Sequence, residues 1–146
     1  MNKIMKASLL KKIKKWEYSE LPLPSNYNQN KYALIKTSLN GICSTDVLRS
    51  MKTGFYNYPI VPGHEIIGKV FNIKNNKKIK KGDRVAAYPL IQCKKCKHCK
   101  NKNPNLCDNY SFLGSRTNGG YADFVLCPIE NLVKIPDEVS NEKAVF

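Results

Sequence analysis

Residues 93–107 read CKKCKHCKNKNPNLC and place four cysteines within fifteen residues: Cys93, Cys96, Cys99 and Cys107. Cysteines three positions apart in a tight turn can aim both sulfur atoms at one metal, and the last cysteine returns as a fourth ligand. With every position filled by a thiolate, the spacing predicts a closed, structural zinc site. The interleaved lysines favour the thiolate form and offset the negative charge of such a site.

Two other uses of cysteine fit this run less well. Disulfide bonds belong to oxidising compartments, and lysines interrupt every apolar part of the N-terminal MNKIMKASLLKKIKKW that a secretory signal peptide would need. An iron–sulfur cluster of the bacterial ferredoxin type has a shorter spacing before its last cysteine and a proline after it, whereas Asp108 follows Cys107. Because thiolates already fill the site, His98 is expected to face solvent.

The composition describes a strongly basic chain with the length of one domain. It has 146 residues and a formal charge of +14. No apolar run approaches the roughly 18 residues of a membrane-spanning helix, so we expect a cytoplasmic protein with no membrane partner. The charge admits a nucleic-acid-binding module. However, the positive residues are mostly lysines spread from Lys3 to Lys143, so nucleic acid is not the expected partner.

Short alternating segments separated by turn residues predict a mainly β fold with short helices. The predicted strands are residues 4–10, 13–18, 32–40, 65–73, 84–87, 121–128 and 132–135, with a solvated connection at 74–81. A short helix is expected after Cys43, with Ser44 or Thr45 as its cap and with Val47, Leu48 and Met51 at helical spacing. Ser140 has the character of an N-cap, so we expect the chain to stop inside an element of a longer, truncated protein.

A second set of metal-binding residue types lies in GICSTD, residues 41–46, and PGHE, residues 62–65. Cys43 and His64 are of types that bind zinc, and Asp46 could orient the imidazole from behind. Taken singly, each has another interpretation, because a lone thiol is commonly a small buried residue and a lone histidine is commonly structural. Four glycines are expected at turns or close backbone approaches, and Cys127 in the packing of a strand: the glycines are Gly63, Gly68, Gly119 and Gly120.

The order and spacing of five segments resemble the zinc-containing medium-chain alcohol dehydrogenases. The segments are GICSTD, VPGHEIIGKV, GDRVAAYP, the four-cysteine lobe and GSRTNGGYADFVLCPIENLVKIP. The resemblance covers nearly the whole chain and is to the GroES-like catalytic domain, within the branch of polyol and galactitol-1-phosphate dehydrogenases. It implies that residues 1–146 form a GroES-like, partly open β-barrel with a structural zinc lobe at about 90–110.

The same resemblance implies roles for single residues. Cys43 and His64 would bind a catalytic zinc with Glu65 beside it as an alternate ligand, while Thr45 would relay the proton of the alcohol and Asp46 would support the site. An alkoxide formed at the open zinc position would then give hydride to NAD or NADP. The chain departs from the common family pattern at Ser44, where many relatives have glycine.

The resemblance also implies what lies outside this chain. No Gly-x-Gly-x-x-Gly follows a predicted strand, so the dinucleotide-binding Rossmann domain is absent from these residues and the chain alone is expected to be inactive. A third ligand of the catalytic zinc is expected beyond Phe146, and the family implies a homo-oligomer.

Three hypotheses follow. The first is a catalytic domain of a zinc-dependent alcohol or polyol dehydrogenase, with a small-molecule alcohol, polyol or sugar-alcohol phosphate as substrate. The second is a zinc-stabilised nucleic-acid-binding module. The third is a non-catalytic, truncated relic that keeps only structural zinc.

Overall fold

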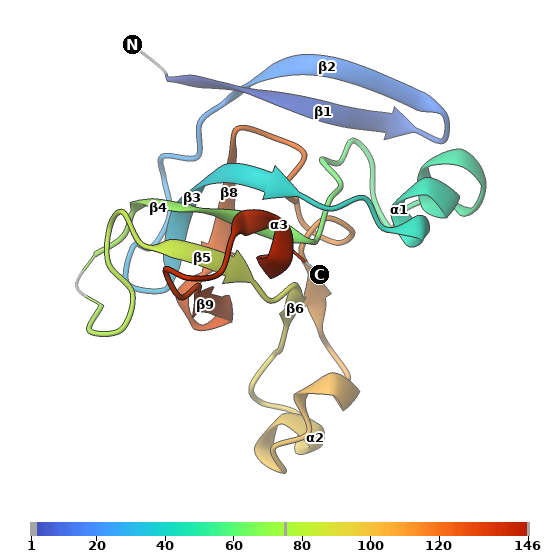
Figure 1. The fold of residues 1–146 in the computed structure, drawn as a ribbon. Coiled ribbons are helices and arrows are strands. Elements are labelled where there is room, and N and C mark those ends of the chain that lie inside the picture. The colour runs from blue at the N-terminus through green and yellow to red at the C-terminus, as the bar shows by residue number, and fades with distance from the viewer. Residues whose placement is uncertain (1–2, 75, 146) are drawn as a thin grey trace.

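The computed structural model describes residues 3–74 and 76–145, and these form open antiparallel sheets with short helical turns (Figure 1). A five-stranded sheet in the order β8-β3-β4-β5-β9 forms the body, and two further pairs, β1–β2 and β6–β7, flank it. The strands are β1 Ile4–Lys12, β2 Lys15–Pro22, β3 Tyr32–Asn40, β4 Ile66–Asn72, β5 Arg84–Ala87, β6 Leu90–Ile91, β7 Ser111–Phe112, β8 Phe124–Pro128 and β9 Leu132–Lys134. The helical segments are α1 Ser44–Leu48, the π-helical turn η1 Arg49–Thr53, α2 Lys97–Lys100, η2 Pro104–Leu106, η3 Ile129–Asn131 and α3 Asn141–Ala144.

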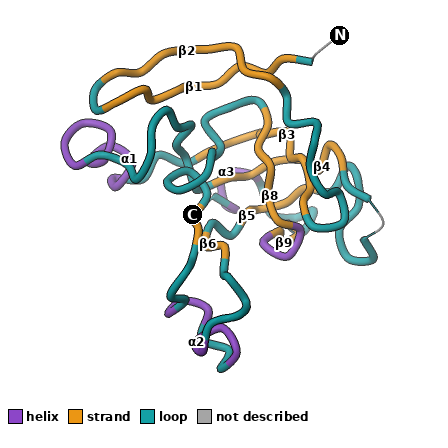
Figure 2. The backbone as a smooth tube through the Cα atoms, turned by 180° about the vertical axis from the view of Figure 1, so that it is seen from behind, coloured by secondary structure: helices purple, strands orange, loops and turns teal. Residues whose placement is uncertain are grey.

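The sheets agree with the predicted mainly β, partly open architecture and do not close into a complete barrel. Figures 1 and 2 show the β1–β2 hairpin and the lobe that contains α2 at opposite ends of the domain. None of the helices within residues 3–74 and 76–145 has the length and apolar content that crossing a membrane requires.

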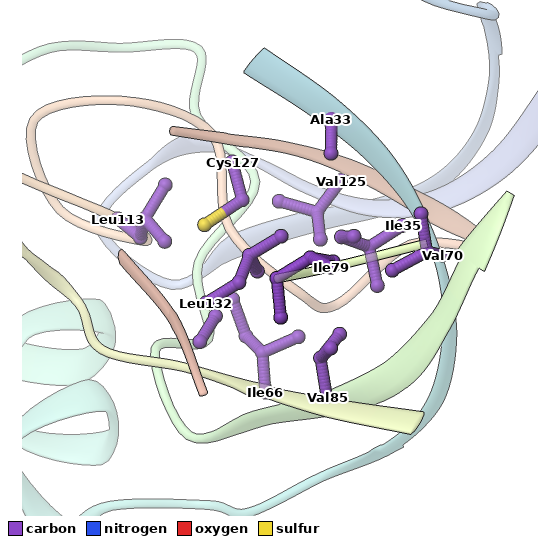
Figure 3. Close-up of a cluster of buried hydrophobic side chains, with 11 residues drawn as sticks. Ala33, Ile35, Ile66, Val70, Ile79, Val85, Leu113, Val125, Cys127 and Leu132 are labelled. Atoms are coloured by element: carbon purple, nitrogen blue, oxygen red, sulfur yellow. The ribbon is translucent and has the colours of Figure 1, made fainter. Parts of the chain in front are cut away.

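The main core fills the space enclosed by the five-stranded sheet (Figure 3). Alternation along β3 directs Ala33 and Ile35 into this core, and both are fully buried. The other members come from the remaining strands and two loops: Ile66, Val70, Ile79, Val85, Ala87, Leu113, Val125, Cys127 and Leu132. Cys127 is therefore a packing residue, as expected, and the 74–81 connection is anchored by buried Ile79 and is only partly solvated.

The β1–β2 hairpin packs on a smaller cluster. Ala7 and Leu9 of β1 are buried against Val61. Backbone bridges from Ala7 to Ala122 and from Leu10 to Ile60 tie the hairpin to the loops that enter β4 and β8. The hairpin therefore fixes the positions of two loops that lie far apart in the sequence.

All seven predicted strands occur, with one clear error of boundary. The strand predicted at 121–128 begins at Phe124, because the preceding residues pair with β1: the Ser8 N–H donates to the Tyr121 carbonyl at 2.8 Å, and the Asp123 N–H to the Lys6 carbonyl at 2.9 Å. The β6–β7 ribbon was not predicted, since two-residue strands carry no alternation.

The helix after Cys43 begins as predicted, but its cap differs. Cys43 itself occupies the N-cap position and no side chain caps the helix. The residues at helical spacing, Val47, Leu48 and Met51, are all partly exposed at 52%, 48% and 42%. Their spacing therefore does not mark a face buried within this domain.

We predict that Gly68→Ala destabilises the sheet, because β3 leaves no room for a side chain at Gly68 of β4. A Cβ there would overlap the Lys36 carbonyl oxygen and lie 2.5 Å from Ile35 Cγ2. Overpacking of this kind costs about 1–3 kcal/mol in the free energy of unfolding. Thermal unfolding should show a lower Tm than for Lys69→Ala, the matched control on the exposed neighbouring position. Equal Tm values for the two variants would contradict the prediction.

Candidate metal centres

The four cysteines of residues 93–107 come together at the tip of the lobe carried by the β6–β7 ribbon (Figure 1). Their sulfur atoms all lie within 4.8 Å of one another. The sulfurs of Cys93 and Cys99 are 4.0 Å apart. Sulfurs arranged tetrahedrally around zinc at about 2.3 Å are separated by about 3.8 Å, so the arrangement fits one zinc ion.

The local backbone structure fixes the positions of these sulfur atoms. Cys96 is the N-cap of α2, and its sulfur accepts a hydrogen bond from the Cys99 N–H at 3.5 Å. Pro104 begins η2, which returns the chain so that Cys107 Sγ accepts from the Cys93 N–H at 3.3 Å. The sulfurs thus already accept backbone hydrogen bonds, as metal-binding thiolates do.

The same backbone groups adjust the acidity of the thiols. Hydrogen bonds from the N–H groups of Lys95 and Cys96 lower the pKa of Cys93 to about 6. The N–H of Cys99 lowers the pKa of Cys96, whereas burial raises the pKa of Cys99 to about 12. At neutral pH some ligands are therefore already thiolates, and binding of a metal would release the remaining protons.

The lobe has no apolar core to hold this shape. Within residues 93–107 only Cys107 is buried. Lys94 and Lys102 adopt left-handed backbone conformations with φ of 63° and 60°, each of which costs about 1–2 kcal/mol outside glycine. A bound metal is the kind of cross-link that can compensate these costs, so the residues present fit a structural zinc.

Two neighbours of the lobe stay outside the thiol cluster. His98 is partly exposed, and its Nε2 lies 3.7 Å from Asp108 Oδ1. Lys94 forms an ion pair with Glu130, which connects the lobe to η3. The expectation that His98 is a surface residue and not a ligand agrees with this placement.

A second group of ligand atoms lies where α1 and β4 begin. Single ligand atoms of Cys43, His64 and Glu65 lie within 4.8 Å of one another. A Cβ on Gly41 would overlap the Glu65 carboxylate, so glycine leaves the space that this side chain occupies. Gly63 has a φ of +92°, a left-handed conformation that turns the chain just before His64.

Asp46 supports this group from behind. Its carboxylate is buried, and Oδ1 lies 3.3 Å from Nδ1 of His64. This interaction raises the pKa of His64 despite the opposing effect of its burial. Because Nδ1 faces the carboxylate, the tautomer with Nε2 free to bind a metal is favoured.

Thr45 lies on the open side of the same group. Its exposed hydroxyl donates a hydrogen bond to Cys43 Sγ at 3.1 Å. That bond, together with the backbone N–H of the same residue, lowers the pKa of Cys43 and favours the thiolate. The structure therefore brings together every residue that the sequence analysis placed at the second site.

Tyr121 was missed by sequence reasoning. Its hydroxyl donates to Asp46 Oδ2 at 3.1 Å and lies 3.3 Å from the Gly41 carbonyl oxygen. Burial raises the pKa of Tyr121, so the phenol stays a neutral donor. A Cβ on Gly63 would lie 2.6 Å from its ring, so the glycine and the tyrosine fit as a pair. Tyr121 and Asp46 are separated by 75 positions in the sequence, so this contact has no local sequence signal.

A cavity of about 360 Å³ opens beside the second site. It is lined by His64 and Glu65 on one side and by Tyr88 and Pro89 after β5. Ala144 and Val145, at the end of α3, complete its wall. The last described helix therefore lies next to the metal-binding residues.

We predict that Cys96→Ser loses the lobe metal and lowers the Tm, because the metal replaces an apolar core there. Elemental analysis after dialysis against a mild chelator should show one metal ion fewer per chain. His98→Ala is the matched control within the lobe and should keep the metal. Full metal content and an unchanged Tm in the serine variant would refute the structural role of the cluster.

We predict that Tyr121→Phe weakens metal binding at the second site by roughly tenfold, since partners behind a ligand typically contribute 10–100-fold to affinity. Titration with Co²⁺, followed by its visible absorption, measures this affinity. The control is Tyr88→Phe, which removes the hydroxyl of an exposed tyrosine in the lining of the cavity. An unchanged Co²⁺ affinity in the Tyr121 variant would show that the hydrogen bond to Asp46 does not support the site.

Several known proteins are similar to this chain in sequence and in fold. L-galactonate-5-dehydrogenase of Escherichia coli K12 is 34% identical over 120 residues, which cover 81% of this chain and 34% of that protein. The crystal structure of galactitol-1-phosphate dehydrogenase from Escherichia coli superposes with a TM-score of 0.90 and 29% identity, over 97% of this chain and 41% of the other. An alcohol dehydrogenase of Escherichia coli CFT073 (RspB) complexed with NADH gives a TM-score of 0.88 and 29% identity, over 97% and 41% of the two chains.

The chain spans about a third of the length of the curated relatives it matches. The match to a family is nevertheless extensive, because residues 29–137 fit the model described as "Alcohol dehydrogenase GroES-like domain". This range contains both candidate metal centres and all five strands of the main sheet. The chain therefore belongs to the alcohol dehydrogenase GroES-like domain family.

Proposed function

We propose that this chain is the catalytic domain of a zinc-dependent dehydrogenase that oxidises a small polyol with a nicotinamide cofactor. The observation that carries the proposal is the convergence of Cys43, His64 and Glu65 beside a cavity, with Asp46 buried behind the histidine. The names of the relatives support the substrate class, since they act on L-galactonate and galactitol 1-phosphate. Two zinc ions are proposed for each chain, one structural in the lobe and one catalytic.

The residues of the second site have distinct roles in this proposal. Cys43, His64 and Glu65 would hold the metal, and a zinc ion bound there supplies a Lewis acid that lowers the pKa of an alcohol. Asp46 keeps the imidazole in one orientation. Thr45, exposed beside the cysteine, is positioned to take the alcohol proton and pass it to solvent.

The hydride acceptor would come from outside these residues. The 146 residues contain no glycine-rich dinucleotide fingerprint after a strand, so we propose that NAD or NADP is held by a Rossmann domain that accompanies this one. The NADH complex of the RspB relative supports this cofactor class. A homo-oligomer and a cytoplasmic location remain part of the same proposal.

The dehydrogenase interpretation is favoured over both alternatives. A nucleic-acid-binding module does not account for a second ligand set beside a cavity, and the family match favours catalysis. A relic with only structural zinc would not need a buried carboxylate aligned on His64, because burying an unneeded charge is costly.

Metal stoichiometry tests the proposal. The parent chain should bind two metal ions, and the lobe ion should resist chelation longer than the second ion, which has fewer thiolate ligands. Co²⁺ placed at the second site should change its visible spectrum when galactitol is added. Cys43→Ser should bind only the lobe metal and lose the galactitol response, whereas Ser44→Gly, a neighbouring change, should keep both. One metal per chain in the parent, or a galactitol response that survives Cys43→Ser, would overturn the proposal.

A further inference from the structure

The guanidinium groups of Arg49, at the end of α1, and of Arg116 both lie against the ring of Tyr56. The guanidinium carbon of Arg49 lies 4.8 Å from the ring centroid of Tyr56, and that of Arg116 lies 4.1 Å from the same centroid. Arg116 also stacks at 4.5 Å on Tyr110. These contacts join η1 to the loop that follows β7, and they concentrate two positive charges in a small volume.

These two charges have no carboxylate ion-pair partner among the residues that the structure describes. The ion pairs found among residues 3–74 and 76–145 do not include Arg49 or Arg116. The positive potential is felt by Tyr56, whose pKa falls to about 8, mainly through its hydrogen bond with Arg49. Two like charges against one ring repel each other, so a bound anion would relieve an unfavourable arrangement.

The guanidinium groups also have donors to spare. Nε of Arg116 is buried without a hydrogen-bond partner within the described residues. Nη2 of Arg49 reaches the Tyr56 hydroxyl only at 3.5 Å, the limit of a hydrogen bond. Each guanidinium offers five N–H donors, and the hydroxyls of Tyr56 and Tyr110 can engage only some of them. Tyr56 is 54% exposed, which leaves the group open to a ligand from solvent.

Both arginines lie on segments that carry the second metal site. Arg49 opens the π-helical turn that continues α1, the helix that begins directly after Cys43. Turns of this kind are rare and are concentrated at functional sites. On the other segment the Arg116 N–H donates to the Phe112 carbonyl at 3.0 Å, and the Phe112 ring packs edge-on at 5.6 Å against His64. The arginine pair is thus connected to the metal ligands through direct neighbours.

We propose that Arg49 and Arg116, flanked by Tyr56 and Tyr110, bind the phosphate group of a polyol phosphate whose alcohol end reaches the Cys43–His64 site. This inference rests on the proposed dehydrogenase function and names its substrate class. Two planar guanidiniums match the charge and geometry of a phosphate monoester. A neutral polyol would leave both charges unpaired.

A purely structural role for the pair makes a different prediction. If stacking only clamps η1 to the loop after β7, replacing either arginine should lower the Tm and leave the affinity for anions unchanged. Anion binding and thermal stability therefore have to be measured on the same variants.

The first experiment titrates the zinc-loaded chain with inorganic phosphate and follows the Arg Nε–H signals by NMR. We expect the Arg49 and Arg116 signals to shift, and Arg49→Gln and Arg116→Gln each to weaken phosphate binding by roughly tenfold. Lys52→Gln, which removes one exposed charge from the same helical turn, should bind as the parent does. Unshifted arginine signals in the parent, or equal affinities in Arg49→Gln and Lys52→Gln, would overturn the proposal. The Arg49 and Arg116 signals of the unmutated chain test the proposal even if Arg116→Gln fails to fold.

The second experiment compares ligands on the chain carrying Co²⁺ at the second site. Galactitol 1-phosphate should change the cobalt spectrum at a concentration at least tenfold lower than galactitol, and this advantage should vanish in Arg49→Gln. The proposal would be overturned if galactitol 1-phosphate and galactitol changed the cobalt spectrum at the same concentration. It would also be overturned if gluconate changed the spectrum at the same concentration as the phosphate ester. Arginine-dependent phosphate binding without any cobalt binding would support the anion site and refute the proposed dehydrogenase function. Failure of the phosphate-site proposal and failure of the proposed dehydrogenase function are therefore distinguishable.

Discussion

The hydrogen-bonded chain from Tyr121 through Asp46 to His64 is the interaction on which the second metal site depends. A buried carboxylate is costly unless it is well paired, and Asp46 has a partner on each oxygen. Those partners belong to the loop before β4 and to the segment that the β1–β2 hairpin holds in place. The hairpin supplies no candidate ligand, yet it thereby contributes to the orientation of the histidine.

Close backbone approach is the second requirement of this region. The carbonyl oxygen of Gly63 lies where a Cβ on Gly114 or Gly119 would be, so the loops before β4 and after β7 meet without intervening side chains. This contact brings Phe112 against His64 and sets Arg116 on the same side of the domain as α1. The proposed metal ligands and the proposed phosphate-binding arginines are therefore parts of one packed arrangement.

The features that could be predicted from sequence are those with a local signal. Cysteine spacing predicted the lobe, alternation predicted β3, and the motifs around Cys43 and His64 identified the second ligand set through a family resemblance. Tyr121 and the arginine pair gave no such signal, because their contacts join residues distant in the chain. The late start of β8 has the same cause, since pairing with β1 overrides the local strand pattern.

The proposed function requires that Cys43 and His64 form a zinc site separate from the lobe. Anomalous diffraction at the zinc edge, from crystals grown with excess zinc, tests it most directly. We expect two anomalous peaks: one among the four lobe sulfurs, and one about 2.3 Å from Cys43 Sγ and about 2.0 Å from His64 Nε2, with Nδ1 still facing Asp46. A single peak in the lobe, with Cys43 and His64 unbound at saturating zinc, would contradict it.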